Sequence, residues 1–116
     1  MSTSAFDELA ARLAAPAKSG AYLTRNELVA LARVTEGSLR YNERKRMLAD
    51  VFKSAPDADG LVALLDRLQE FWRDQLSRYD ELAAEFPTSA PFFADWQTKA
   101  RATLASLAKI RDEVRL

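Results

Sequence analysis

Residues 61–86, LVALLDRLQEFWRDQLSRYDELAAEF, decide the fold of this chain. Apolar side chains recur there in alternating steps of four and three residues, with one glutamine among them. The series is Leu61, Leu65, Leu68, Trp72, Gln75, Tyr79, Leu82 and Phe86. Such steps place a continuous apolar stripe along one face of an α-helix. The stretch therefore predicts a helix roughly 40 Å long that must bury this stripe against another element.

The element that covers this stripe is expected to follow directly along the chain. After Pro87, either Thr88 or Ser89 is expected to cap a last helix. That helix repeats the same steps through Phe93, Trp96, Ala100, Thr103, Leu107, Ile110 and Val114. Because the connection is short, the two long helices are expected to pack as antiparallel neighbours.

The two stripes also predict a register for this hairpin. A turn near residues 88–90 places Trp72 opposite Leu107 and Gln75 opposite Thr103. A polar residue within a helical seam is costly unless it is paired, and a matched polar layer fixes the register. We therefore predict a contact between the side chains of Gln75 and Thr103, either direct or through water.

Three shorter helices are expected before the hairpin, near residues 4–15, 24–36 and 39–54. Thr24 and Glu27 have the spacing of a capping box. Gly37 either ends the second of these helices or only weakens it, so residues 24–54 form one helix or two. The chain is thus expected to be all-α and a single helical-bundle domain over residues 1–116. We expect about five helices, with three shorter N-terminal helices packed on a long C-terminal antiparallel helical hairpin.

Composition narrows the chemistry that the chain can perform. The 116 residues carry no net charge, and they include no histidine and no cysteine. The commonest general base and the imidazole and thiolate metal ligands are therefore missing. With three glycines, the chain also has no glycine-rich phosphate loop. We expect no catalytic site, no cofactor and no metal site, so the chain is not expected to be an enzyme.

No apolar run approaches the roughly 20 residues that span a bilayer, and the N-terminus does not resemble a secretory signal. We therefore expect a cytoplasmic protein that does not insert into membranes.

The stretch EFPTSAPFFADW, residues 85–96, carries the first candidate site. Packing is the favoured interpretation, with Phe86, Trp96 and one of Phe92 or Phe93 closing the end of the bundle. Phe92 and Phe93 point about 100° apart on a helix, so both need not face the same layer. A phenylalanine left exposed would mark a partner-binding site, so Phe92 and Phe93 are candidate contact residues.

The stretch LRYNERKRM, residues 39–47, carries the second candidate site through Arg40, Tyr41, Arg44 and Arg46. Basic and aromatic side chains together can contact phosphates and stack on a base. However, the sequence pI of about 6.3 is far from that of a basic nucleic-acid-binding domain. The favoured interpretation is a solvated helix face that complements the acidic residues 56–89.

These observations favour a non-catalytic cytoplasmic protein-interaction module, such as an adaptor, a chaperone-like factor or a regulator. A protein partner is expected, and self-association as a homodimer or larger homo-oligomer is an open possibility. The alternative is a nucleic-acid-binding regulator that uses residues 40–46.

Overall fold

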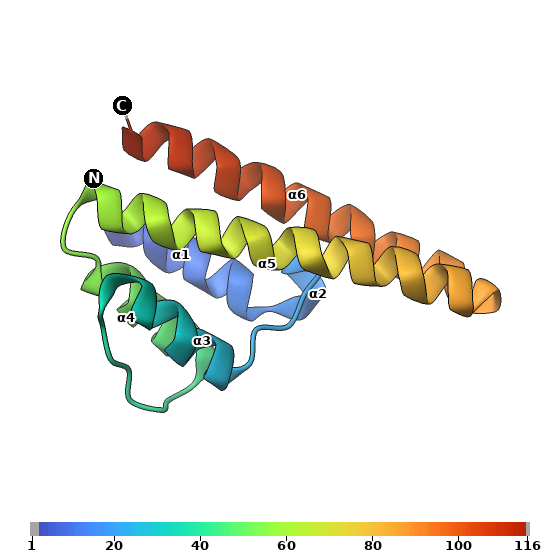
Figure 1. Cartoon of the computed structure of the whole chain (residues 1–116), viewed down its shortest axis with the longest axis horizontal. Helices are drawn as coiled ribbons and strands as arrows, with labels where there is room; N and C mark the ends of the chain where they lie inside the picture. The colour runs from blue at the N-terminus through green and yellow to red at the C-terminus, as the bar shows by residue number, and fades with distance from the viewer. Residues whose placement is uncertain (1–2, 116) are drawn as a thin grey trace.

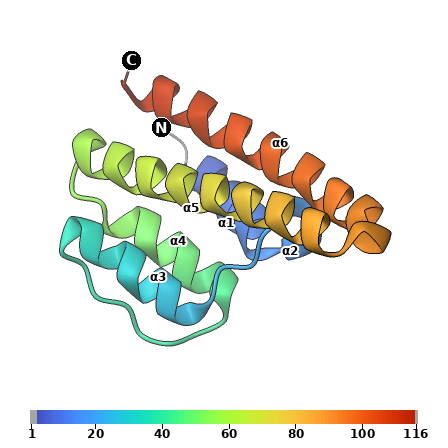
Figure 2. The same cartoon turned by 45° about the vertical axis from the view of Figure 1, so that its right-hand side comes forward.

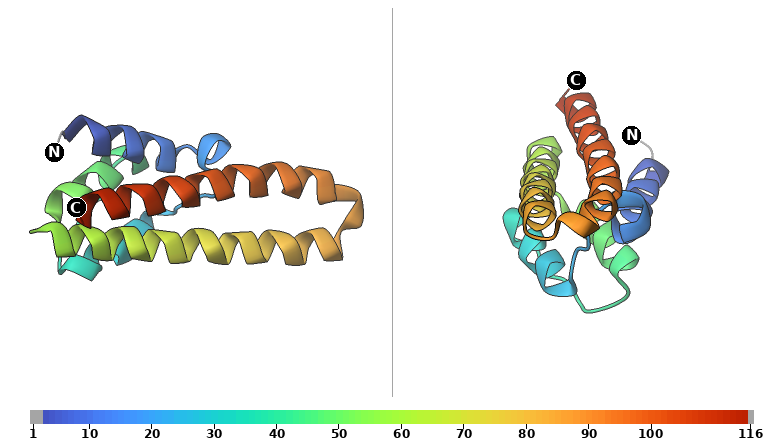
Figure 3. Two further views of the ribbon diagram at one scale, coloured as in Figure 1. Left: turned by 90° about the horizontal axis from the view of Figure 1, so that it is seen from above. Right: turned by 90° about the vertical axis from the view of Figure 1, so that its right-hand side faces the viewer.

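The two longest helices form the antiparallel hairpin that the two stripes predict. The computed structural model describes residues 3–115, with the side chains of residues 6–114. Helix α5 (Ala58–Glu85) and helix α6 (Ala90–Arg115) are joined by the short 3₁₀ turn η2 (Pro87–Ser89) and run side by side (Figures 1 and 3). Asp80 accepts a hydrogen bond from Gln97, and Asp66 pairs with Arg111 at 2.6 Å. Each partner lies one residue from the position that the predicted register assigns.

Four shorter helices pack against this hairpin. They are α1 (Thr3–Ala14), α2 (Pro16–Ser19), α3 (Arg25–Ala32) and α4 (Arg44–Ser54). Seen end-on, α1 and α2 lie beside α6, α3 lies beside α5, and α4 lies between α1 and α3 (Figure 3, right). All regular elements among the described residues are α-helices and 3₁₀ turns, and none is a strand. This confirms the predicted all-α class. The one-turn helix α2 is the element that the prediction of about five helices lacked.

Residues 24–54 form two helices rather than one. The capping box is present, because the Glu27 amide donates to the Thr24 hydroxyl and the Thr24 amide donates to the Glu27 carboxylate. Helix α3 runs into the 3₁₀ turn η1 (Arg33–Thr35), and Glu36 ends it with a left-handed backbone. The expected helix start near residue 39 is wrong, since residues 36–43 form a loop that extends away from the bundle (Figure 2).

The core lies where α1, α3 and α4 meet the first half of α5. Leu13, Leu28, Leu48 and Leu65 are fully buried there, each from a different helix. Burying a side chain of this size contributes about 1.5–3 kcal/mol, so this layer is a main source of stability. Leu107 of α6 is buried as well.

Helix α2 is wedged against α6, and its end is held by side chains of the hairpin. The Ser19 carbonyl accepts hydrogen bonds from Trp72 Nε1 and from the Thr103 hydroxyl, both at 2.9 Å. The described residues contain no direct hydrogen bond between Gln75 and Thr103, so the direct form of the predicted contact is wrong, and the contact through water stays a prediction. The polar seam residue Thr103 is satisfied by a backbone carbonyl of α2, and among the described residues it forms no hydrogen bond with Gln75.

The hairpin extends beyond the shorter helices at its turn (Figure 1). There the two helices have no third layer to cover them, and Phe86 is 50% exposed. The expectation that Phe86 closes the end of the bundle is wrong for this reason. Phe93 and Trp96, about one and two turns into α6, are half-buried.

Candidate interaction site

An apolar hollow of about 330 Å³ lies on the side of the hairpin next to α2. Five aromatic residues and one proline line it, and we call it the aromatic groove: Pro16, Tyr22, Tyr79, Phe92, Phe93 and Trp96. Pro16 begins α2, Tyr22 lies on the connection from α2 to α3, Tyr79 belongs to α5, and the other three belong to α6. The fold thus gathers residues from three distant parts of the sequence.

The rings of the groove support one another in a fixed order. Phe93 stacks on Tyr79 with ring centroids 6.4 Å apart, and Phe92 lies edge-on to Phe93 at 5.8 Å. Phe92 also packs against Trp96 at 6.0 Å. Offset and edge-on pairs of this kind each contribute about 0.5–1.5 kcal/mol beyond the area they bury. Phe92 is nevertheless 62% exposed, so it is the phenylalanine left outside the core.

Tyr79 anchors the floor of the groove to the fold. Its hydroxyl donates a hydrogen bond to the Gly20 carbonyl, at the end of α2. Burial raises the pKa of Tyr79 above its usual value, because the phenolate form would lose solvation there. The neutral, hydrogen-bonded phenol therefore persists to alkaline pH.

Two cations border the groove. The Arg44 guanidinium lies 4.1 Å from the centroid of the Tyr22 ring and donates to the Leu23 carbonyl. The Lys99 ammonium lies 5.5 Å from the Trp96 ring and pairs with Asp95 at 3.1 Å. Cation–π contacts of this type orient the rings and give the rim of the groove a positive character.

The structure separates the four residues predicted as a basic site. Arg44 reaches the aromatic groove, whereas Arg46 lines a different hollow together with Asp7 and Asp50. Residues two apart on a helix point about 200° apart, which explains this division. Arg40 is exposed on the loop over residues 36–43, and the Tyr41 hydroxyl on the same loop donates to the Asn26 side chain.

Of the predicted contact residues, Phe92, Phe93 and Arg44 come together at one site. Sequence reasoning assigned Tyr79 and Trp96 to the core, and it did not single out Pro16 or Tyr22. The aromatic character of Tyr79 and Trp96 was visible, but no local signal indicates that α2 brings Pro16 and Tyr22 to them.

Comparisons of the chain with protein-family models, curated proteins and solved structures give no match. None of the helices within residues 3–115 has both the length and the apolar character needed to cross a membrane. The interpretation of the site therefore depends on its own geometry.

Proposed function

We propose that the chain is a non-catalytic cytoplasmic interaction module that holds an apolar segment of a partner protein in the aromatic groove. The observation that carries this proposal is the exposure of Phe92 at a hollow walled by four further aromatic rings. Aromatic residues are enriched at protein interfaces, and the residues that dominate binding energy lie in pockets of this kind. Contiguous exposed apolar surface on a folded domain is a recurring mark of such interfaces.

The rim of the groove supports recognition of a partner that also carries acidic groups. Arg44 lies over Tyr22 at one wall of the groove, and Lys99 lies over Trp96 at another. An acidic residue flanking the bound apolar segment would meet a cation at either wall. Complementary charge at a rim mainly accelerates association and selects partners, while the buried rings supply affinity.

The test is capture of a partner from the native host by the wild-type chain and by the Phe92→Ala variant. We expect the variant to lose at least tenfold in affinity for the captured protein, since truncating a central aromatic anchor commonly costs about 2 kcal/mol or more. Because Phe92 is mostly exposed, the Phe92→Ala variant should lose only the stability that the ring contacts with Phe93 and Trp96 contribute, and it should stay folded at the assay temperature. Val34, which is 41% exposed on η1 and outside the groove, offers a matched control. The Val34→Ala variant should retain full capture.

Two outcomes would contradict the assignment. Undiminished capture by the Phe92→Ala variant would remove the groove as the binding site. Capture that is lost only in step with a lower melting temperature would make Phe92 a packing residue. Light-scattering mass tells whether the partner is a second copy, since a dimer through this groove would revert to monomer in the Phe92→Ala variant.

Nucleic-acid binding by residues 40–46 remains the alternative proposal, with less support. Arg46 shares its hollow with two lysines and three carboxylates, so the charges there balance and do not form a basic patch for phosphates. Arg44 is engaged with Tyr22 and Leu23. We expect no binding of single-stranded DNA or RNA in fluorescence anisotropy at low salt. Binding that weakens steeply with added salt, and that the double variant Arg40→Ala/Arg44→Ala abolishes, would favour the alternative.

A further inference from the structure

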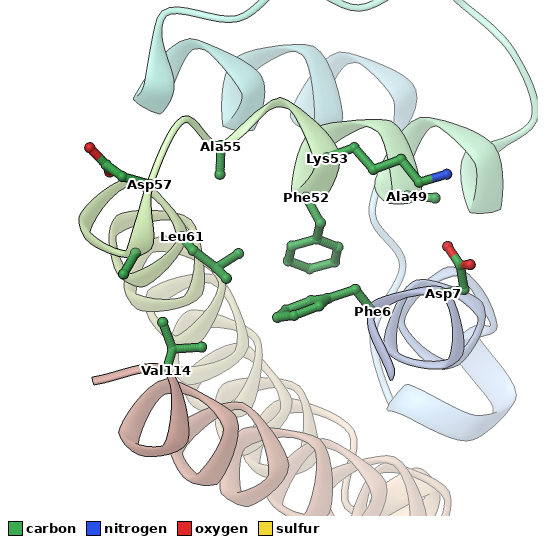
Figure 4. A pocket seen from close by; sticks show the side chains of 10 residues that line it. Phe6, Asp7, Ala49, Phe52, Lys53, Ala55, Asp57, Leu61 and Val114 are labelled. Carbon is green, nitrogen blue, oxygen red and sulfur yellow. The ribbon is translucent and has the colours of Figure 1, made fainter. Parts of the chain in front are cut away.

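A second hollow lies at the other end of the bundle, away from the hairpin turn. It encloses about 300 Å³, and its walls are mainly apolar (Figure 4). Phe6 of α1, Phe52 of α4, Leu61 of α5 and Val114 of α6 each contribute a wall, and Ala55 borders it between α4 and α5. We call this hollow the apolar cavity. Volumes of 300 Å³ and above are typical of sites that hold small molecules.

A polar hollow adjoins the apolar cavity. The two share Asp7, Ala49 and Lys53, so they meet at the same edge of α1 and α4. The polar hollow carries three carboxylates and three cations: Asp7, Glu43, Asp50, Lys45, Arg46 and Lys53. Among the described residues, none of these six side chains takes part in an ion pair. Their charges balance, and they remain open to a ligand.

We infer that this end of the bundle binds a small amphipathic molecule with an alkyl chain and a zwitterionic head group. The apolar cavity has room for roughly ten groups of the size of a water molecule, which suits an alkyl chain of about ten carbons. Burying each methylene contributes about 0.8 kcal/mol, so the chain would supply most of the affinity.

The balanced charges select the head group. A singly charged head would be attracted by three of the six groups and repelled by the other three. A head with both charges can place its negative end near Lys53 and its positive end near Asp7, which face each other at the shared edge (Figure 4). Complementary placement of this kind determines specificity rather than overall affinity.

The experiment uses three probes of equal chain length: decyl phosphocholine, decanoate and decyltrimethylammonium, each below its micelle concentration. Methyl NMR spectra of the wild-type chain report where each probe binds. We expect decyl phosphocholine to shift the methyl signals of Ala49, Ala55, Leu61 and Val114. We also expect it to bind at least tenfold more tightly than the singly charged probes. Equal affinity for all three probes would overturn the head-group assignment, and shifts confined to residues near Phe92 would overturn the site.

Ala49→Leu tests the junction of the two hollows directly. The larger side chain should occupy the entrance and weaken binding of decyl phosphocholine at least tenfold while the chain stays folded. Ala102→Leu, the same change at an exposed position of α6, should leave binding unchanged. If the Ala49 variant does not fold, Ala55→Leu fills the cavity from another wall. Unchanged affinity in the folded blocking variant would refute the inference.

Discussion

The replacement of Gly20 by alanine tests the central feature of this fold, the wedge of α2 against α6. Gly20 ends α2 with φ of +84°, in the left-handed region that side chains disfavour. A Cβ atom placed there would lie 2.4 Å from the Ala100 nitrogen and 2.7 Å from the Trp96 carbonyl oxygen. Both are backbone atoms of α6, so a side-chain rotation cannot relieve the clash.

The expected cost follows from three contributions. The left-handed conformation costs a residue with a Cβ about 1–2 kcal/mol, and forcing an extra carbon into a packed contact costs about 1–3 kcal/mol. Moving α2 outward also weakens the hydrogen bonds to the Ser19 carbonyl, which contribute about 1 kcal/mol each. Alanine also lowers the conformational entropy of the unfolded chain, which offsets about 0.4–1 kcal/mol of these costs. We therefore expect Gly20→Ala to lower the free energy of unfolding by about 4 kcal/mol, a large part of the 5–15 kcal/mol typical of a domain.

Urea unfolding followed by circular dichroism measures this change, and Trp72 fluorescence reports on the wedge itself. The control is Gly37→Ala, because Gly37 has no left-handed φ and its nearest contact from an added Cβ is 3.2 Å. The control should remain within about 1 kcal/mol of the wild type. If Gly20→Ala is as stable as Gly37→Ala, the close approach of α2 to α6 is not what restricts this position, and the reasoning fails.

Three further substitutions address single interactions in the same region. Thr103→Val should lower the free energy of unfolding by about 1–2 kcal/mol, because it removes the donor to the Ser19 carbonyl. Thr98→Val, on the exposed face of α6, is the control. It should change the free energy of unfolding by less than about 0.5 kcal/mol in the same urea assay. Gln75→Leu should leave the free energy of unfolding unchanged or raise it, since Gln75 is half-buried and forms no direct hydrogen bond with Thr103. A decrease of more than about 1 kcal/mol would instead support the predicted contact between Gln75 and Thr103. The raised pKa of Tyr79 means that its share of stability is complete below about pH 10 and is lost as the pH rises further. Tyr79→Phe should therefore reduce the fall in melting temperature above about pH 10, and an unchanged fall would show that other groups cause it.

The hairpin and its caps could be predicted because their signals are local. The steps of four and three along residues 61–86 form an apolar stripe that must pack against another one. Residues 93–114 form a second apolar stripe of the same kind. Asp57 caps α5, and its carboxylate accepts a hydrogen bond from the Gly60 amide at 2.8 Å. Caps and stripes of this kind depend on residues within a few turns of one another, so a single sequence reveals them.

The wedge could not be predicted, because its acceptor is a backbone carbonyl. Pro16 begins α2 and Gly20 ends it, so the segment between α1 and α3 contains a one-turn helix that no periodic pattern reveals. Which group satisfies Thr103 depends on how closely α2 approaches α6, and Gly20 permits an approach that the pattern of apolar residues does not encode. The sequence therefore predicted that Thr103 has a polar partner, but it assigned Gln75 to that role in place of the Ser19 carbonyl.

The candidate site was predicted only in part for a related reason. Phe92 and Phe93 stood out because two adjacent aromatic residues on a helix point about 100° apart and need not face the same layer. The opposite wall, with Pro16 and Tyr22, lies about 70 residues away along the chain and is placed there by α2. Arg44 reached the groove, whereas Arg46 points to another side of α4. Arg40 lies on the preceding loop, because α4 begins later than its apolar pattern suggested.

The wedge links the stability of the fold to the aromatic groove but not to the apolar cavity. Pro16 and Tyr22 lie on either side of Gly20, whose carbonyl accepts from Tyr79 on the groove floor. Loosening α2 should therefore shift one wall of the groove relative to the other. The apolar cavity is bounded by α1, α4, the first turn of α5 and the last turn of α6, and α2 contributes no residue to it. We accordingly expect Thr103→Val to weaken partner capture while affinity for decyl phosphocholine is retained. Parallel loss at both sites would show instead that the bundle loosens as a whole.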